Sequence, residues 1–99
     1  MVIQPDLIAD VTLYPSERSP RRGPMWGEFF SCPCKLEMDA PDAWDCRILL
    51  GNERIALGET KRVGIAFLSG EKAASMFRAA GRFYLWELGI IGEAKVVSN

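Results

Sequence analysis

The stretch that decides the fold is residues 82–97, which read RFYLWELGIIGEAKVV. Aromatic and β-branched residues run on both sides of a turn glycine, Gly89, and this pattern is typical of two strands joined in a hairpin. In the first of these strands, Tyr84 and Trp86 face the side opposite Phe83, because side chains alternate along a strand. Both sides of that strand are therefore apolar, and one of them needs a cover outside its own core, either a helix or a partner.

Upstream of this hairpin, short apolar runs separated by glycine, proline and charged residues predict further strands. They lie at 7–14, 26–37, 43–50, 54–57 and 61–68. In the run over 26–37, period-two alternation places Trp26 on the same inward face as Cys32 and Cys34. Pro33 cannot donate a ladder hydrogen bond, which indicates a sheet edge or a bulge at that point.

Residues 71–80 break the strand pattern. Their apolar side chains, among them Ala73 and Phe77, recur at helical spacing and predict an amphipathic helix. Ser69 is expected to cap the start of this helix, and Gly81 to take the left-handed position after its end. The apolar stripe of the helix is one candidate cover for the aromatic strand that follows it.

The chain has 99 residues, 48% of them hydrophobic, which suits a single domain over 1–99. Six or seven short strands in that length predict an all-β sandwich or small barrel. No apolar run has the length of a membrane-spanning helix, and the N-terminus does not read as a secretion signal. With three cysteines, an odd number, we expect a cytoplasmic protein with reduced thiols.

Two parts of the sequence resemble the third domain of elongation factor Tu. Residues 81–87 (GRFYLWE) and 91–97 (IGEAKVV) resemble the closing hairpin of that domain, in which an arginine–phenylalanine strand ends in a glutamate–glycine turn. The strand over 7–14, followed by a basic loop that contains 21–24 (RRGP), resembles its first hairpin. The resemblance implies a closed, mostly antiparallel, six-stranded Greek-key barrel with one short helix near 71–80.

The sequence also departs from the pattern of that family. Its hairpin turn reads Glu87-Leu88-Gly89, and Ala94 stands where the family has the second glycine of the closing strand. No Gly-x-x-x-x-Gly-Lys-Ser/Thr loop occurs in the chain, so a GTPase part is missing and no nucleotide is expected.

Catalysis is not expected from this composition. The chain has no histidine, which removes the commonest general base and the commonest metal ligand. Glu28, Glu87 and Glu93 lie within predicted strands, where a pair of carboxylates could act as acid and base. We favour ion pairs at strand edges for them instead, with Arg47, Arg82 or Lys95 as partners. No catalytic residue, cofactor or metal is therefore assigned.

Cys32, Cys34 and Cys46 are the residues most suggestive of chemistry. Three thiolates could bind zinc with a fourth ligand, but the Cys-x-Cys spacing is unusual for zinc. Cys32 and Cys34 lie roughly 6.5–7 Å apart along a strand, which is too far for an easy disulfide. We expect all three to be buried free thiols that pack as small hydrophobes, with metal binding and redox chemistry as the alternatives.

Arg18, Arg21 and Arg22 form the main local concentration of positive charge. Guanidinium groups suit phosphates, and the resemblance implies RNA contact, since barrels of that family touch the transfer RNA backbone. The net charge of −1 is unlike the strongly basic character of most nucleic-acid-binding modules. An acidic stretch is expected to be a solvated connection that complements the basic loop of a neighbouring copy. It contains Glu37, Asp39, Asp42 and Asp45.

These observations predict a non-catalytic protein-interaction module, which docks a protein partner or a second copy of itself through Tyr84 and Trp86. The alternative is a translation-related RNA-binding adapter that uses Arg18, Arg21 and Arg22. No DNA or membrane partner is expected.

Overall fold

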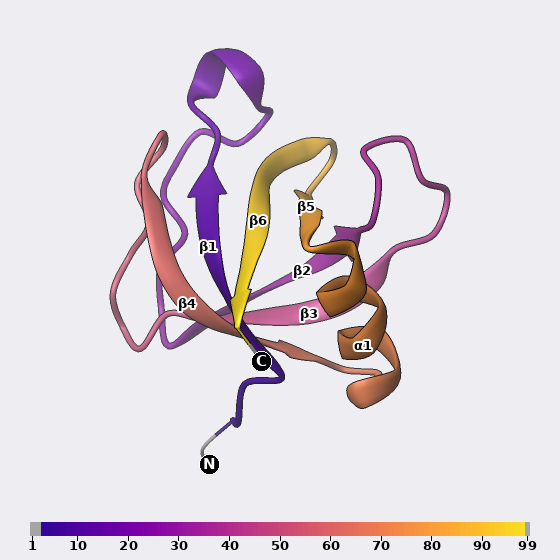
Figure 1. Cartoon of the computed structure of the whole chain (residues 1–99). Coiled ribbons are helices and arrows are strands. Elements are labelled where there is room, and N and C mark those ends of the chain that lie inside the picture. The colour runs from indigo at the N-terminus through magenta and orange to yellow at the C-terminus, as the bar shows by residue number, and fades with distance from the viewer. Residues whose placement is uncertain (1–2, 99) are drawn as a thin grey trace.

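A computed structural model describes residues 3–98 as a β-barrel with one α-helix (Figure 1). The strands are β1 (Leu7–Leu13), β2 (Phe29–Lys35), β3 (Trp44–Leu49), β4 (Thr60–Phe67), β5 (Arg82–Trp86) and β6 (Ile90–Ser98). The helix α1 is Glu71–Ala80, and a short 3-10 turn, η1, covers Ser16–Arg18. The structure confirms the predicted all-β class, the six strands of a closed barrel and the helix over 71–80.

The strands close into the barrel in the order β1-β4-β3-β2-β5-β6, and every pair of neighbours is antiparallel. β2, β3 and β4 follow one another as a meander, and β4 then lies beside β1. The long connection from β1 to β2 makes this a Greek-key arrangement. Closure covers most of the backbone donors and acceptors that an open sheet would leave at its edges.

Alternate side chains of each strand fill the interior. The four inward residues of β1 are completely buried, namely Leu7, Ala9, Val11 and Leu13. On β6, Gly92 lies so close to β1 that a Cβ added there would overlap the carbonyl oxygen of Thr12. Glycine at this position therefore permits the close approach of the first and last strands.

The helix α1 closes one opening of the barrel. Its buried ring, Phe77, has its centroid 4.8 Å from that of Phe67 on β4 and 4.8 Å from that of Phe83 on β5. Both partners are inward-facing residues, so the apolar side of α1 packs onto the core. The helix is thus not the cover for Tyr84 and Trp86, which lie on the opposite side of β5.

The cap predicted for the start of α1 is wrong, whereas the glycine predicted for its end is confirmed. The residue before the helix is Gly70, at φ 65° and ψ −142°, and no side chain caps the first turn. The predicted Ser69 cap is wrong, because the turn at Gly70 places Ser69 one residue too early. At the other end Gly81 adopts the predicted left-handed conformation, with φ 76°.

The contact between β2 and β5 is the shortest in the barrel. Only Cys34 with Leu85 and Lys35 with Tyr84 pair across it. Near this contact the guanidinium group of Arg21 stacks on the ring of Phe30 of β2, 4.7 Å from its centroid. This region is called the β2–β5 seam below.

The long strand predicted over 26–37 is shorter than expected. Gly27 adopts φ 112° and breaks the alternation before β2 begins. As a result Met25 is buried and forms a single bridge with Ile55, whereas Trp26 is 70% exposed. The inward orientation predicted for Trp26 is therefore wrong, and 54–57 contributes this one bridge rather than a strand.

Within residues 3–98, no helix combines the length and the apolar character that crossing a membrane requires.

Candidate interaction surface

The loop between β1 and β2 carries the three arginines predicted to contact phosphate, and the structure gives them different roles. Arg21 donates from Nε to Gly23 O at 2.8 Å and from Nη2 to Pro24 O at 2.6 Å. Its Nη1 forms an ion pair with Glu87 at 2.8 Å, and the Arg21 side chain is only 15% exposed. Arg21 therefore fastens the loop to the turn between β5 and β6, and three of its N–H groups are already used.

The other two arginines remain at the surface. The guanidinium carbon of Arg18 lies 4.3 Å from the centroid of the Tyr14 ring, which is a cation–π contact. Arg22 donates from Nη1 to Ser19 O at 3.0 Å. Both side chains are exposed, so their charge is available to a partner.

The loop and the turn between β5 and β6 touch each other. A Cβ added at Gly89 would lie 3.2 Å from Pro20, which shows how closely the turn packs on the loop. Together with the ion pair between Arg21 and Glu87, this contact brings the predicted arginine set beside the predicted aromatic set on β5.

Tyr84 and Trp86 are half-buried on the outer side of β5. Tyr84 lies opposite Glu93 on β6, and the Tyr14 hydroxyl donates to Glu93 Oε1 at 2.8 Å. Lys35 on β2 places its Nζ 5.5 Å from the centroid of the Trp86 ring. Aromatic rings and basic side chains thus alternate over the outer surface of β5 and its neighbours.

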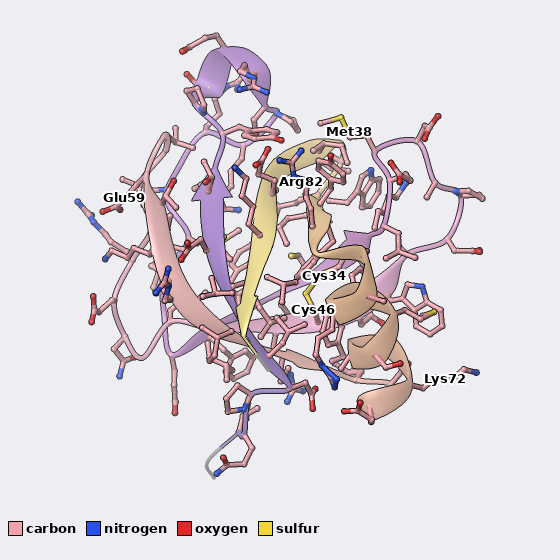
Figure 2. The ribbon with its side chains drawn as sticks, in the orientation of Figure 1. Cys34, Met38, Cys46, Glu59, Lys72 and Arg82 are labelled. Atoms are coloured by element: carbon pink, nitrogen blue, oxygen red, sulfur yellow. A yellow bond between two sulfur atoms is a disulfide. The ribbon has the colours of Figure 1, made fainter. Side chains whose placement is uncertain are left out.

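Two pKa shifts describe the electrostatics of this surface. Burial raises the pKa of Tyr14 to about 12, and its hydrogen bond to Glu93 adds to the effect. The Tyr84 hydroxyl beside Arg82 raises the pKa of that guanidinium group, with Glu93 contributing in the same direction. Tyr14 is therefore a neutral hydrogen-bond donor at ordinary pH, and Arg82 is a fixed positive charge at the rim (Figure 2).

Leu88 is the feature of this surface that folding does not explain. It occupies the turn after Trp86 with φ 59°, and it is 87% exposed. A left-handed backbone costs an ordinary residue roughly 1–2 kcal/mol, and an exposed leucine gains nothing from burial in return. We define the β5 face as Tyr84, Trp86 and Leu88 with the basic residues Arg18, Lys35 and Arg82 around them.

The three cysteines converge, as Figure 2 shows for Cys34 and Cys46 inside the barrel. Their sulfur atoms lie within 4.8 Å of one another. Cys34 and Cys46 are joined in a disulfide with a Cα–Cα distance of 6.4 Å, and Cys32 is a free thiol. The expectation of three free, reduced thiols is therefore wrong for this pair. Cys46 faces Cys32 across the two strands, so the partner of Cys34 lies diagonally opposite on β3.

This cluster does not suit a metal or a redox reaction. A disulfide leaves one thiol in place of three thiolate ligands, and the described residues add no histidine or carboxylate to the group. Burial raises the pKa of Cys32 to about 12, so its sulfur stays protonated at neutral pH and is a poor nucleophile. All three side chains are buried, and the cluster acts as part of the core.

The three carboxylates predicted to pair at strand edges differ in outcome. Glu28 precedes β2 and forms no ion pair among the described residues, and Glu93 accepts a hydrogen bond from the Tyr14 hydroxyl. Glu87 pairs with Arg21 rather than with Arg47, Arg82 or Lys95, because the loop folds back onto the turn. The acidic stretch is exposed at all four of its carboxylates, which are Glu37, Asp39, Asp42 and Asp45.

Sequence reasoning identified Tyr84, Trp86 and the arginine loop, but it did not identify Leu88. The missed signal was an apolar residue inserted between the glutamate and the glycine of a hairpin turn, where short polar residues or glycine are usual.

No protein-family model matches this sequence, and no curated protein is similar enough to count as a match.

Proposed function

We propose that the chain is a non-catalytic docking module that binds a second copy of itself through the β5 face. The observation that carries the proposal is Leu88, an exposed leucine in a left-handed turn beside two half-buried aromatic rings. Aromatic side chains and arginine are enriched at protein contacts, and charged groups lie mainly at the rim.

Charge complementarity favours a second copy as the partner. The rim of the β5 face carries Arg18, Lys35 and Arg82, whereas the connection between β2 and β3 carries three exposed carboxylates and the start of β3 adds Asp45. One chain therefore offers both an acidic and a basic surface, and a second chain can pair the two. The module resembles a barrel domain whose family role is docking, which agrees with this use.

Light scattering after size-exclusion chromatography tests the proposal. Wild-type protein should elute with a mass above that of one chain as concentration rises, and Leu88→Glu should be monomeric over the same range. Leu68→Glu is the matched control, because Leu68 is also exposed, at 61%, but lies at the end of β4. A wild-type mass of one chain at every concentration contradicts self-association, and equal behaviour of the two variants contradicts the β5 face.

A translation-related RNA-binding adapter is the second candidate. Arg18 and Arg22 are exposed, Arg18 lies over the Tyr14 ring, and aromatic rings with basic neighbours bind single-stranded RNA. Arg21 is held in an ion pair with Glu87 and is therefore less available to a phosphate group. This weakens the RNA-binding candidate relative to docking. A gel-shift assay with the double variant Arg18→Gln and Arg22→Gln checks it, since real phosphate contacts should give binding that falls steeply with salt and is lost in the variant.

A cytoplasmic location belongs to the same proposal. Cys34 and Cys46 are fully buried, so cellular reductants reach their disulfide only when the core opens. Thiols are alkylated at the moment of cell lysis in protein that is unfolded, and mass spectrometry then counts the modified cysteines. We expect one modified cysteine per chain, Cys32. Three modified cysteines would show that the pair is reduced in the cell.

A further inference from the structure

A second surface, distant in the sequence from the β5 face, combines a cavity with a guanidinium group that lacks a partner. The cavity has a volume of about 370 Å³. It lies where the segment before β1, the outer side of β3 and the connection from β4 to α1 meet. Residues from these three elements line it, including Ile3, Asp6, Arg47, Leu68 and Gly70. The segment before β1 and the connection from β4 to α1 both lie toward the lower end of the barrel in Figure 1.

Arg47 is the unusual residue of this cavity. Its Nε atom is buried and has no hydrogen-bond partner among residues 3–98. Among the described residues, no carboxylate forms an ion pair with it. The one contact recorded for its guanidinium group is with Phe29, whose ring centroid is 5.0 Å from the guanidinium carbon. Stacking uses the flat face of a guanidinium group and leaves the N–H groups at its edge free.

A comparison with Arg78 shows why this arrangement points to a ligand. Arg78 also has a buried Nε without a partner, but its terminal nitrogens pair with Glu71 on the same helix. Arg47 has no such compensation. The terminal nitrogens of Arg47 have no carboxylate partner among the described residues, so an incoming carboxylate can pair with them.

The rest of the cavity indicates which anion fits. Ile3 and Leu68 supply apolar surface, and Leu68 is 61% exposed without a ligand. Asp6 also lines the cavity, where its Oδ2 accepts the backbone N–H of Phe67 at 2.7 Å. An aliphatic acid can use this apolar surface and a bare phosphate cannot, and the charge of Asp6 opposes any second negative charge.

We propose that this cavity is a binding site for a carboxylate attached to a small apolar group, with Arg47 as the residue that pairs with the carboxylate. The apolar group lies against Ile3 and Leu68, and the carboxylate accepts hydrogen bonds from the edge of the guanidinium group. Two sources share this chemistry, a free aliphatic acid and the C-terminal residue of a peptide.

A titration followed by ¹H–¹⁵N NMR tests the site with probes matched in shape. Isovalerate carries the carboxylate, and isovaleramide has the same shape without the charge. We expect saturable shifts at the amides of Arg47, Leu68 and Gly70 with isovalerate and at least about tenfold weaker binding of isovaleramide, since a charge-assisted hydrogen bond contributes about 1.5–3 kcal/mol. Equal binding of the two probes, or no saturable shift with either, overturns the proposal.

Three variants sharpen the same measurement. Arg47→Met keeps the stem over Phe29 and should weaken isovalerate at least about tenfold, while Arg62→Met, which removes a guanidinium group from the outer side of β4, should leave its affinity unchanged. Asp6→Asn should tighten binding, because it removes a repulsive charge. Unchanged affinity in Arg47→Met overturns the assignment, whatever its effect on stability.

Two further probes identify the ligand class and its source. Inorganic phosphate should bind more weakly than isovalerate, and tighter binding of phosphate overturns the assignment of a carboxylate. An N-acetylated Gly-Gly-Leu peptide with a free C-terminus is compared with its C-terminal amide. A peptide acid that binds more tightly than isovalerate identifies a chain terminus as the source, and one that binds no better identifies a free acid.

Discussion

β1 and β2 are both strands of seven residues in one barrel, yet they are held to their neighbours in different ways. β1 pairs with β4 and with β6 over six residue pairs each. β2 pairs with β3 over six but with β5 over two. Around the short contact Arg21 supplies a side-chain link, because it stacks on Phe30 of β2 and pairs with Glu87 after β5, whereas the disulfide of Cys34 joins β2 to β3. The comparison teaches that one barrel can be closed by a backbone ladder on one side and by side chains on the other.

Removing the disulfide, which ties β2 to β3, has the largest expected effect on how β2 is held. The double variant Cys34→Ala and Cys46→Ala should lose about 3 kcal/mol of unfolding free energy, because the bond closes a short loop in the unfolded chain. Urea unfolding measures the loss. Cys32→Ala is the matched control from the same cluster and should lose much less. A double variant as stable as that control would show that the disulfide adds nothing to the ladder between β2 and β3.

Two arginines compare the seam with the β1–β4 contact directly. Arg21→Met should lose about 1–3 kcal/mol, since it breaks an ion pair and two hydrogen bonds to carbonyl groups of a half-buried loop. Arg62→Met should lose less than about 1 kcal/mol, because the pair of Arg62 with Asp10 is exposed beside a complete ladder. Thermal unfolding of the two variants checks the order, and equal losses would contradict a seam that depends on side chains.

Raising the pH tests the stability of both regions. At neutral pH these two groups change the stability less than the substitutions above. The pKa of Tyr14, beside β6, and that of Cys32, at the seam, are both raised to about 12 from ordinary values near 10 and 9. The folded state therefore holds its proton where the unfolded state has released it, so the stability that each group contributes below its ordinary pKa is lost as pH rises toward 12.

The variants Tyr14→Phe and Cys32→Ala separate the two contributions. Urea unfolding of wild-type protein should show a decline that begins above pH 9, and Cys32→Ala should delay it toward pH 10. Tyr14→Phe should remove the later part of the decline. Parallel curves for all three proteins would mean that neither group retains its proton in the fold.

Much of the fold followed from local pattern. Alternation predicted β1 almost to the residue, and helical spacing predicted α1 within 71–80. Errors arose where backbone conformation interrupts the pattern. The positive φ of Gly27 turned Trp26 outward, and the turn at Gly70 removed Ser69 from the capping position.

The candidate surfaces were less predictable than the strands. Tyr84 and Trp86 could be placed on the outer side of a strand from alternation alone, because neighbouring residues of a strand face opposite ways. The ion pair of Arg21 could not be predicted, since its partner Glu87 is 66 residues away along the chain. The isolation of Arg47 is likewise a property of its surroundings, set by which charges the fold brings near it.

The sequence by itself therefore determined the helix, the six barrel strands and the buried side of most strand residues, because period-two and helical spacing are local properties. Only the tertiary structure decided which strands are neighbours, and with them the disulfide between Cys34 and Cys46, the ion pair of Arg21 and the cavity beside Arg47. The physical reason is that strand pairing depends on packing among segments far apart in the chain, which no local pattern encodes.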